Sequence, residues 1–450
     1  MLLVTILIIL IELGVAVSSP VRFVLLSLWV QTIPYTWNWD AQLVFDTPVG
    51  PLNVIAMQLF GFCLCCLVII GIRFEKVAAQ AKVYGWHLAF IGFAVLSMVY
   101  APSVAYGFRM IAKLLGPVLF LIVVLISINT VDEIRKVQRA ILGSGVILLG
   151  LALYARAMGY NSDPNALQTG FAGLGPPSMG PPVFSAHMLP VAMLAFASFV
   201  SRRNTLMLLF ALVCGASILT ALQRTSAGAL YLGFSVILFF GTRGIWRLLL
   251  PSIGVVGLPL LMVFNETFRR RMFFGKNGSQ ELLDDPTAAL GKINTSGRSG
   301  LWSNMLDRFF DPHPIIGSGV GATQDALFSR STGASGVAHS EYVRLLCEMG
   351  LTGLLLFGVM AVAYGVMLRK LTARTNGVLQ RTLALAAIGS LLTYLLYCST
   401  DNAFDYVTQF GIYVFGLIGA SLRARQLALP ESRSYEGMTA TTNIFPNLLR

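Results

Sequence analysis

Two arginines and one histidine are the residues of this 450-residue chain whose surroundings best suit chemistry on an anion. Arg224 stands at a junction between two apolar runs and is flanked by Gln, Thr and Ser. Arg298 lies among small residues, and an open guanidinium can bind phosphate oxygens through two parallel hydrogen bonds. His339 precedes an expected helix start, and its imidazole can accept a hydroxyl proton near neutral pH. The three residues predict a site that binds an anion and moves a proton.

Each of these residues also has an ordinary structural explanation. Arg224 could extend from a helix end to the lipid headgroups. Arg298 could pair with an acid such as Asp307, and a lone loop histidine such as His339 is usually just solvated. The polar neighbours favour a functional role for Arg224, because an arginine near the membrane is costly unless it faces a cavity, a partner or a headgroup. For Arg298 and His339 the residues alone leave both explanations open.

Three further polar residues could line a cavity on the same side. His187 lies near the start of an apolar run, and His313 is held in a rigid turn between two prolines. Asp401, followed by Asn402, borders another apolar run, where it could hydrogen-bond a sugar or cap the helix. We include His187, His313 and Asp401 as candidate substrate-binding residues.

The glycine-rich segment 317–321 could offer backbone N–H groups to an anion, and Gly317 and Gly319 are therefore also candidates for substrate binding. The segment follows no predicted strand and lacks the Gly-Lys-Ser/Thr of a nucleotide-binding loop, which favours a tight turn. Downstream, Glu341, Arg344 and Glu348 recur at helical spacing and predict a row of ion pairs along one helix face.

The composition is that of a membrane protein. The chain is 56% hydrophobic and 12% charged, whereas soluble domains run at about 45–50% apolar and about 25% charged. The 32 Lys and Arg against 20 Asp and Glu sit largely in short loops, where positive charge sets membrane orientation. The basicity therefore does not indicate nucleic acid. The six cysteines form no disulfide framework and no cluster has metal-ligand spacing, so we expect no metal and no cofactor.

The apolar runs predict an all-α fold, a polytopic transmembrane helical bundle. A spanning helix needs about 20 mostly apolar residues. Candidate spans are 2–17, 21–36, 53–72, 86–101, 110–128, 140–158, 183–200, 205–222, 226–241, 245–265, 349–368, 383–399 and 406–422. Because the first two are short and adjacent, the predicted total is 12 or 13 spans.

If the helices alternate, the basic loops fall on one side, which should be cytoplasmic. This divides the chain into helices with short loops over 1–265, a large periplasmic loop over 266–348, further helices over 349–425 and a cytoplasmic tail over 426–450, expected to be disordered. Within the loop, apolar spacing from Ser299 to Phe310 predicts an amphipathic helix, and a new helix should start near Ser340.

Together these motifs resemble the O-antigen ligase/polymerase superfamily of bacterial envelope proteins. The resemblance covers about 170–420 and rests on the Arg224 turn, Gly297-Arg298 followed by Trp302, His313-Pro314-x-x-Gly317-x-Gly319, and His339 followed by Glu348-x-Gly350. One departure is Ser340, where family members commonly carry Asn.

The resemblance implies a metal-independent, inverting glycosyltransferase of the bacterial inner membrane, with its active site facing the periplasm. Its donor would be an undecaprenyl-pyrophosphate-linked glycan, with membrane lipid and other polysaccharide-assembly proteins as partners. Arg224 and Arg298 would hold the pyrophosphate and stabilise its charge as it leaves. His339 would activate or orient the acceptor hydroxyl.

The acceptor separates the alternatives within this class. We favour a polymerase that extends an exopolysaccharide or O-antigen chain; a ligase acting on lipid A-core, or on protein, would use the same chemistry. A transporter or flippase of lipid-linked sugars belongs to a different class and predicts ionisable residues at mid-bilayer. The in-span charges Glu12, Lys113 and Arg156 form no obvious relay, which favours the enzyme.

Overall fold

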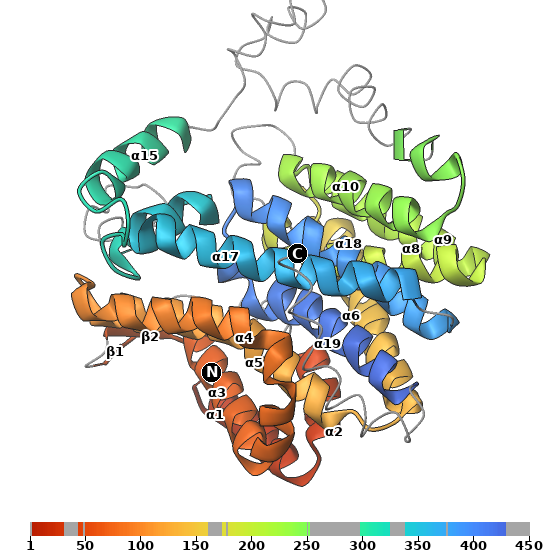
Figure 1. The fold of residues 1–450 in the computed structure, drawn as a ribbon, viewed down its shortest axis with the longest axis horizontal. Helices are drawn as coiled ribbons and strands as arrows, with labels where there is room; N and C mark the ends of the chain where they lie inside the picture. The colour runs from red at the N-terminus through yellow and green to blue at the C-terminus, as the bar shows by residue number, and fades with distance from the viewer. Residues whose placement is uncertain are drawn as a thin grey trace, which may run out of the picture.

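The computed structural model describes residues 2–30, 44–47, 50–160, 173–176, 179–249, 251–252, 298–324, 338–374 and 377–428. These residues form a bundle of helices, drawn as coiled ribbons in Figure 1. The predicted all-α class is confirmed, since the extended pairing within these ranges is limited to one short hairpin of β1 (Val44–Thr47) and β2 (Gly50–Asn53).

Eight helices in the described ranges are apolar and long enough to cross a membrane. Seven of them are α4 (Phe74–Ser97), α5 (Val104–Ser127), α6 (Val131–Ala157), α8 (Pro181–Arg202), α10 (Arg224–Gly241), α17 (Glu341–Arg374) and α18 (Val378–Thr400). The eighth is the continuous segment Val407–Leu427, formed by the π-helical turn η5 (Val407–Gly411) and α19 (Ile412–Leu427). The shorter apolar helices are α1 (Leu2–Ser18), α2 (Pro20–Val30), α3 (Val54–Ile72) and α9 (Thr205–Thr220). Most of the predicted span 245–265, namely 250 and 253–265, lies outside the described residues, so the total of 12 or 13 spans stays a prediction.

Several helices begin earlier than the apolar runs predict, α4 and α6 by the largest margins. In α6 the side chain of Thr130 accepts from the Glu133 N–H at 3.2 Å, and the Glu133 carboxylate accepts from the Thr130 N–H at 3.1 Å. This capping box starts the helix at Val131, ahead of the expected span 140–158. Similarly, α4 starts at Phe74 rather than near 86, so basic residues expected in a loop lie on its first turns. Hydropathy locates the apolar centre of a helix, whereas capping locates its end.

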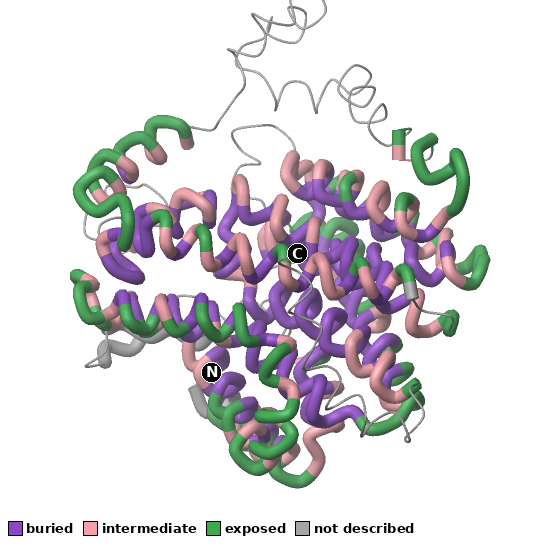
Figure 2. Tube along the Cα trace, viewed as in Figure 1, coloured by how far each residue is buried: buried purple, intermediate pink, exposed green. Residues whose placement is uncertain are grey.

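Four central helices are covered by the others. The apolar windows of α5, α8, α18 and α19 are buried for most of their length, whereas those of α4, α6, α10 and α17 are buried for only about a third. Figure 2 shows this difference as buried segments inside and mixed segments outside. The outer helices expose large apolar side chains such as Leu355 and Val362, which suits a lipid environment.

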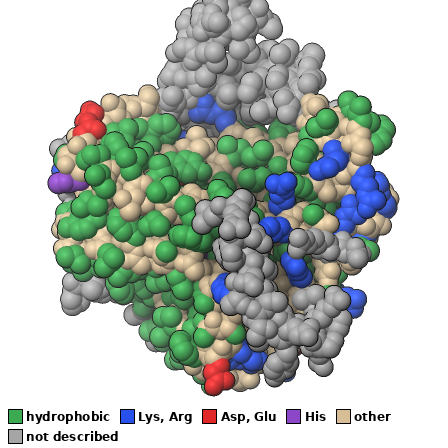
Figure 3. All heavy atoms as spheres, viewed as in Figure 1, with side chains coloured by type: hydrophobic (Ala, Val, Ile, Leu, Met, Phe, Trp, Pro, Cys, Tyr) green, Lys and Arg blue, Asp and Glu red, His purple; other side chains and the backbone are tan. Residues whose placement is uncertain are grey.

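The predicted cytoplasmic residues gather at one end of the bundle. Here Arg423 Nε donates to the Ile128 carbonyl and Arg381 Nη2 to the Gly241 carbonyl, both at 2.6 Å. Arg135 from α6 faces the same pocket as Gln380 from α18. In Figure 3 most Lys and Arg side chains lie toward the right, and hydrophobic side chains cover the middle and left. The bundle thus has a basic end, opposite the end described next.

The loop predicted to be periplasmic is described only over 298–324 and 338–340, since α17 already begins at Glu341. The predicted amphipathic helix is present as α15 (Arg298–Met305), continued by the π-helical turn η3 (Leu306–Phe310). The Trp302 Nε1–H donates to the Ala338 carbonyl at 2.8 Å and ties α15 to the start of α17. The helix start expected near Ser340 is therefore found, and the domain boundary at 348/349 falls inside α17.

A turn of glycines packs against the bend of α17. Gly317, Gly319 and Gly321 all have positive φ, and α17 bends at Gly350, whose φ is 63°. The Ser318 N–H donates to the Cys347 carbonyl and the Gly319 N–H to the Glu348 carbonyl, each at 2.9 Å. The structure thus contains the tight turn that the sequence favoured, docked on the first turns of α17.

We expect Gly317→Ala to lower the free energy of unfolding by roughly 1–3 kcal/mol, because the residue has φ 73° and a Cβ there would lie 2.4 Å from the Glu348 carbonyl carbon. Thermal unfolding of the purified protein in detergent measures this loss. The matched control is Gly358→Ala in α17, where a Cβ meets nothing within 4 Å. An equal fall in both variants would contradict the packing role of Gly317.

Candidate functional site

The end of α18 is the point at which the predicted catalytic segments meet. α10 begins at Arg224, α15 at Arg298, and α17 directly after the segment that carries His339. The Thr225 and Thr400 hydroxyls share a hydrogen bond, and Arg298 Nη1 donates to the Thr400 carbonyl. Residues far apart in the sequence are thereby gathered around one helix end.

His339 contacts Asn402, which follows the C-terminal end of α18. Its backbone N–H donates to the Asn402 side-chain oxygen at 2.8 Å, and the Asn402 amide nitrogen lies 3.3 Å from His339 Nδ1. The Arg298 and His339 segments therefore converge on Thr400–Asn402, and Thr225 brings the start of α10 to the same place. The Asp307 alternative for Arg298 finds no support, since among the described residues the contact recorded for its guanidinium is with Thr400.

The convergence of helix starts favours negative charge. The N-terminus of a helix carries unpaired N–H groups and a partial positive charge. α10 begins without a side-chain cap hydrogen bond, and the side chains of Arg224 and Arg298 are only half-buried. Two guanidiniums beside helix N-termini form an environment in which phosphate oxygens are stabilised.

The His339 imidazole is held neutral. Its pKa is lowered to about 4, first by burial and then by the positive charges of Arg298 and Arg344, while Asp405 acts in the opposite direction. Its backbone lies in the left-handed region with φ 54°, uncommon for a residue other than glycine. Leu222, two residues before Arg224, has φ 57°. Backbone strain of this kind collects at functional sites.

Asp401 lies at the same end of α18 and is buried. One of its oxygens, Oδ1, accepts from the Asn402 N–H at 2.8 Å and from the Tyr406 hydroxyl at 3.0 Å. Burial raises the pKa of Asp401, against the opposing effect of these hydrogen bonds. Asp401 therefore shapes the 401–406 segment, and its contact with a substrate stays a prediction.

An ionic network lies behind the site. Only its pair between Glu341 and Arg344 was predicted from the sequence. Arg344 pairs with Glu341 at 3.2 Å, as helical spacing predicts, and with Asp405 at 3.3 Å. Lys113 from α5 also pairs with Asp405, at 2.6 Å. The Phe404 N–H donates to Glu341 at 2.8 Å, so the network joins α5, α17 and the 401–406 segment.

The predicted row of ion pairs does not extend to Glu348. This carboxylate accepts from the Thr323 hydroxyl instead. The Gly317 and Gly319 backbones pack on α17 and on the Ala101 backbone, so both glycines have a structural role. Binding of a substrate by these two glycines remains a prediction.

The remaining two candidate histidines lie outside this convergence. His187 is fully buried in the bundle, with Nε2 3.2 Å from the Ser144 hydroxyl and its ring 4.4 Å from that of Tyr413. His313 is exposed in the turn after η3, where its carbonyl accepts from the Gly317 N–H at 2.8 Å. The structure does not bring either residue to Thr400–Asn402 through any recorded contact.

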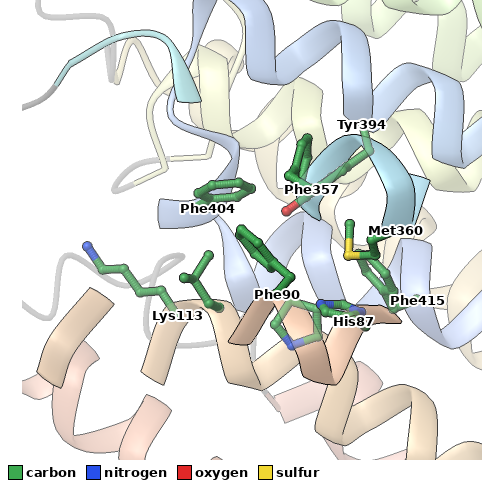
Figure 4. A pocket seen from close by; sticks show the side chains of 10 residues that line it. His87, Phe90, Lys113, Phe357, Met360, Tyr394, Phe404 and Phe415 are labelled. Atoms are coloured by element: carbon green, nitrogen blue, oxygen red, sulfur yellow. The ribbon is translucent and has the colours of Figure 1, made fainter. Parts of the chain in front are cut away.

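An aromatic cavity adjoins the ionic network (Figure 4). It is lined by His87, Phe90, Lys113, Leu114, Pro117, Phe357, Met360, Tyr394, Phe404 and Phe415. In the close-up the Lys113 side chain extends away from the rings, and its ammonium group pairs with Asp405. None of the predicted site residues lines this cavity, so we assign no chemistry to it.

Comparison with known families agrees with the motifs. A family described as O-antigen ligase matches residues 207–358, about a third of the chain. This match confirms the resemblance drawn from the sequence. It includes Arg224, Arg298 and His339 and ends before Thr400–Asn402, the segment contacted by Thr225, Arg298 and His339. No curated protein matches the chain.

Proposed function

We propose that the chain, whose residues 207–358 match a family described as O-antigen ligase, is a membrane glycan polymerase. It transfers an oligosaccharide from undecaprenyl pyrophosphate to a growing exopolysaccharide or O-antigen chain, with inversion and without a metal. The convergence of Arg298, His339 and the start of α10 on Thr400–Asn402 carries this proposal. The site lies at the end of a membrane bundle, where a lipid-linked sugar would be presented.

In the proposed reaction the acceptor hydroxyl oxygen attacks the anomeric carbon from the face opposite the pyrophosphate. The bond between that carbon and the phosphate oxygen breaks, and its electron pair stays with the pyrophosphate. Arg224 and Arg298 stabilise this developing charge, and the helix starts beside them add fixed dipoles. His339 activates or orients the attacking hydroxyl.

The basic end of the bundle supports the proposed orientation. Short loops rich in Lys and Arg stay in the cytoplasm, and the arginines that face the pocket between α6, α8 and α18 lie at that end. The candidate site would then face the periplasm of a bacterium, in its inner membrane. The ion pair of Lys113 with Asp405 supports an enzyme over a transporter, since this in-span charge is committed to a structural contact.

A ligase that moves finished glycan onto lipid A-core is the second candidate, supported by the description of the matching family. Both reactions use the same donor chemistry, and glycans from a deletion strain separate them. Single repeats replacing long chains indicate a polymerase. Long chains that stay on the lipid carrier and are missing from lipid A-core indicate a ligase.

The deletion strain is complemented with wild type, His339→Ala or Arg308→Ala, and the membrane level of each protein is measured. We expect wild type and Arg308→Ala to restore the glycan profile and His339→Ala to fail, because Arg308 is exposed over the Phe309 ring. Full rescue by His339→Ala would remove this histidine from the mechanism. A deletion strain with an unchanged glycan profile would contradict the proposed function.

The pKa of His339 predicts the acid side of the pH profile. With a pKa of about 4 the imidazole is neutral from about pH 5 upward. We therefore expect any acid limb of the transfer rate that depends on His339 to lie near pH 4, not near 6.5. Initial rates of wild type and His339→Gln across this range isolate the contribution of His339, because the titration of other groups affects the rates of both proteins. An acid limb near 6.5 that disappears in His339→Gln would contradict the neutral state.

A further inference from the structure

Asn402 contacts His339 twice, once at the backbone and once at the ring. Its Oδ1 accepts from the His339 N–H at 2.8 Å, and its Nδ2 lies 3.3 Å from His339 Nδ1. Asn402 is buried, with 4% of its surface exposed, and its own N–H donates to Asp401. The Asn402 side chain is therefore positioned at both its oxygen and its nitrogen.

The backbone contact fixes which way the Asn402 amide points. A backbone N–H can only donate, so the side-chain atom that faces it must be the carbonyl oxygen. The amide nitrogen then faces His339 Nδ1. An amide NH₂ has hydrogens and no acceptor lone pair, so Nδ1 must be the acceptor. In a neutral imidazole the single ring hydrogen is then on Nε2.

The charges around the ring agree with a neutral imidazole. The cations that act on it are Arg298 from α15 and Arg344 from α17, and the acid is Asp405 from the 401–406 segment. A proton on Nδ1 would also meet the hydrogens of the Asn402 amide. Both the neighbouring charges and the amide favour the form without a hydrogen on Nδ1.

We propose that Asn402 is a positioning residue that fixes His339 in its Nε2–H tautomer, so that the imidazole offers a hydrogen bond to the substrate instead of accepting a proton. The catalytic consequence rests on the proposed function. His339 then orients the acceptor oxygen, and the proton of the attacking hydroxyl ends on the pyrophosphate oxygen that receives the electron pair. One C–O bond forms, one breaks, and the hydrogen moves from acceptor to leaving group.

The variant Asn402→Asp tests this with almost no change of shape. One carboxylate oxygen keeps the bond to the His339 N–H, and the other now requires a hydrogen on Nδ1. We expect kcat for transfer to fall about 100-fold, the effect of removing one oriented donor, with KM for the lipid-linked donor changed less than about threefold. The loss should shrink as pH falls, because the carboxylate stabilises the imidazolium, in which Nε2 carries a hydrogen again.

Two controls keep this result interpretable. Asn204→Asp makes the same change at the N-cap of α9, where either side chain accepts from the Leu206 N–H, and should leave the rate unchanged. His339→Gln retains an amide donor but no base. We expect it to keep at least about a tenth of the activity, whereas His339→Ala falls about 100-fold. Equal losses in the Gln and Ala variants, or full activity of Asn402→Asp, would overturn the proposal.

A direct measurement of the ring separates this inference from the proposed function. Protein labelled with ¹⁵N-histidine contains four histidines, and His339→Gln identifies the signals of His339. At pH 7 we expect Nδ1 in the unprotonated range and Nε2 in the protonated range. A hydrogen on Nδ1, in the neutral or the charged ring, would overturn the tautomer. The expected spectrum in a protein without transfer activity would instead count against the proposed function alone.

Discussion

Arg298→Ala is expected to lower the transfer rate by about 10²–10³-fold, the cost of removing one group that stabilises charge in a transition state. Its guanidinium is placed at the end of α18 by the bond to the Thr400 carbonyl, next to the segment that positions His339. Because the developing pyrophosphate charge is stronger in the transition state than in the bound donor, kcat should fall more than KM rises. Single-turnover transfer from a purified lipid-linked donor measures the effect.

Two variants define what Arg298 contributes. Arg298→Lys keeps the charge but loses the planar fork that binds two oxygens, so we expect an intermediate rate. Arg308→Ala removes an exposed arginine from the turn after α15, where it stacks on Phe309, and should leave transfer near wild type. Loss of activity in Arg308→Ala as large as in Arg298→Ala would mean that the loop's overall charge matters and not the individual site.

The sequence predicted the helices and picked out the three candidate site residues, because both rest on local properties. Apolar runs identify spans wherever the partner helices lie. Arg298 and His339 were visible through their neighbours and through a family pattern. The structure adds the element that joins them, the end of α18 at Thr400–Asn402. That element is an ordinary helix end in the sequence, and only tertiary contacts show that it is shared.

Lys113 shows why the ionic network could not be predicted. A lysine inside an apolar run is unusual and signals a partner, but its partner Asp405 lies 292 positions away in the chain. The pair of Glu341 with Arg344 was predictable because helical geometry places residues three apart on one face. The positions of His187 and of the glycine turn likewise depend on packing: one is enclosed between helices and the other docks on α17.

Replacing Arg344 should produce the largest loss of stability. The side chain is almost fully buried and pairs with both Glu341 and Asp405. Removing one partner of a buried ion pair leaves charge without compensation and costs about 3–5 kcal/mol, so Arg344→Leu is expected to lower the free energy of unfolding by that amount. Thermal unfolding and denaturant titration of the detergent-solubilised protein measure it. Transfer should fall as well, because the network holds the segment that carries Asn402.

Two further variants test whether the loss of stability in Arg344→Leu comes from the buried ion pairs or from removing any charged side chain. Lys136→Ala breaks a pair with Asp132 at 3.0 Å in which both side chains are more than half exposed, and solvent-screened pairs contribute little, so unfolding should be nearly unchanged. Adding Glu341→Gln to Arg344→Leu removes one of the uncompensated charges and should recover part of the loss. Additive effects would contradict this: the double variant would then be less stable than Arg344→Leu by as much as Glu341→Gln alone destabilises the wild type. In that case the two residues act independently. The network would then not be the element that fixes the 401–406 segment beneath the site.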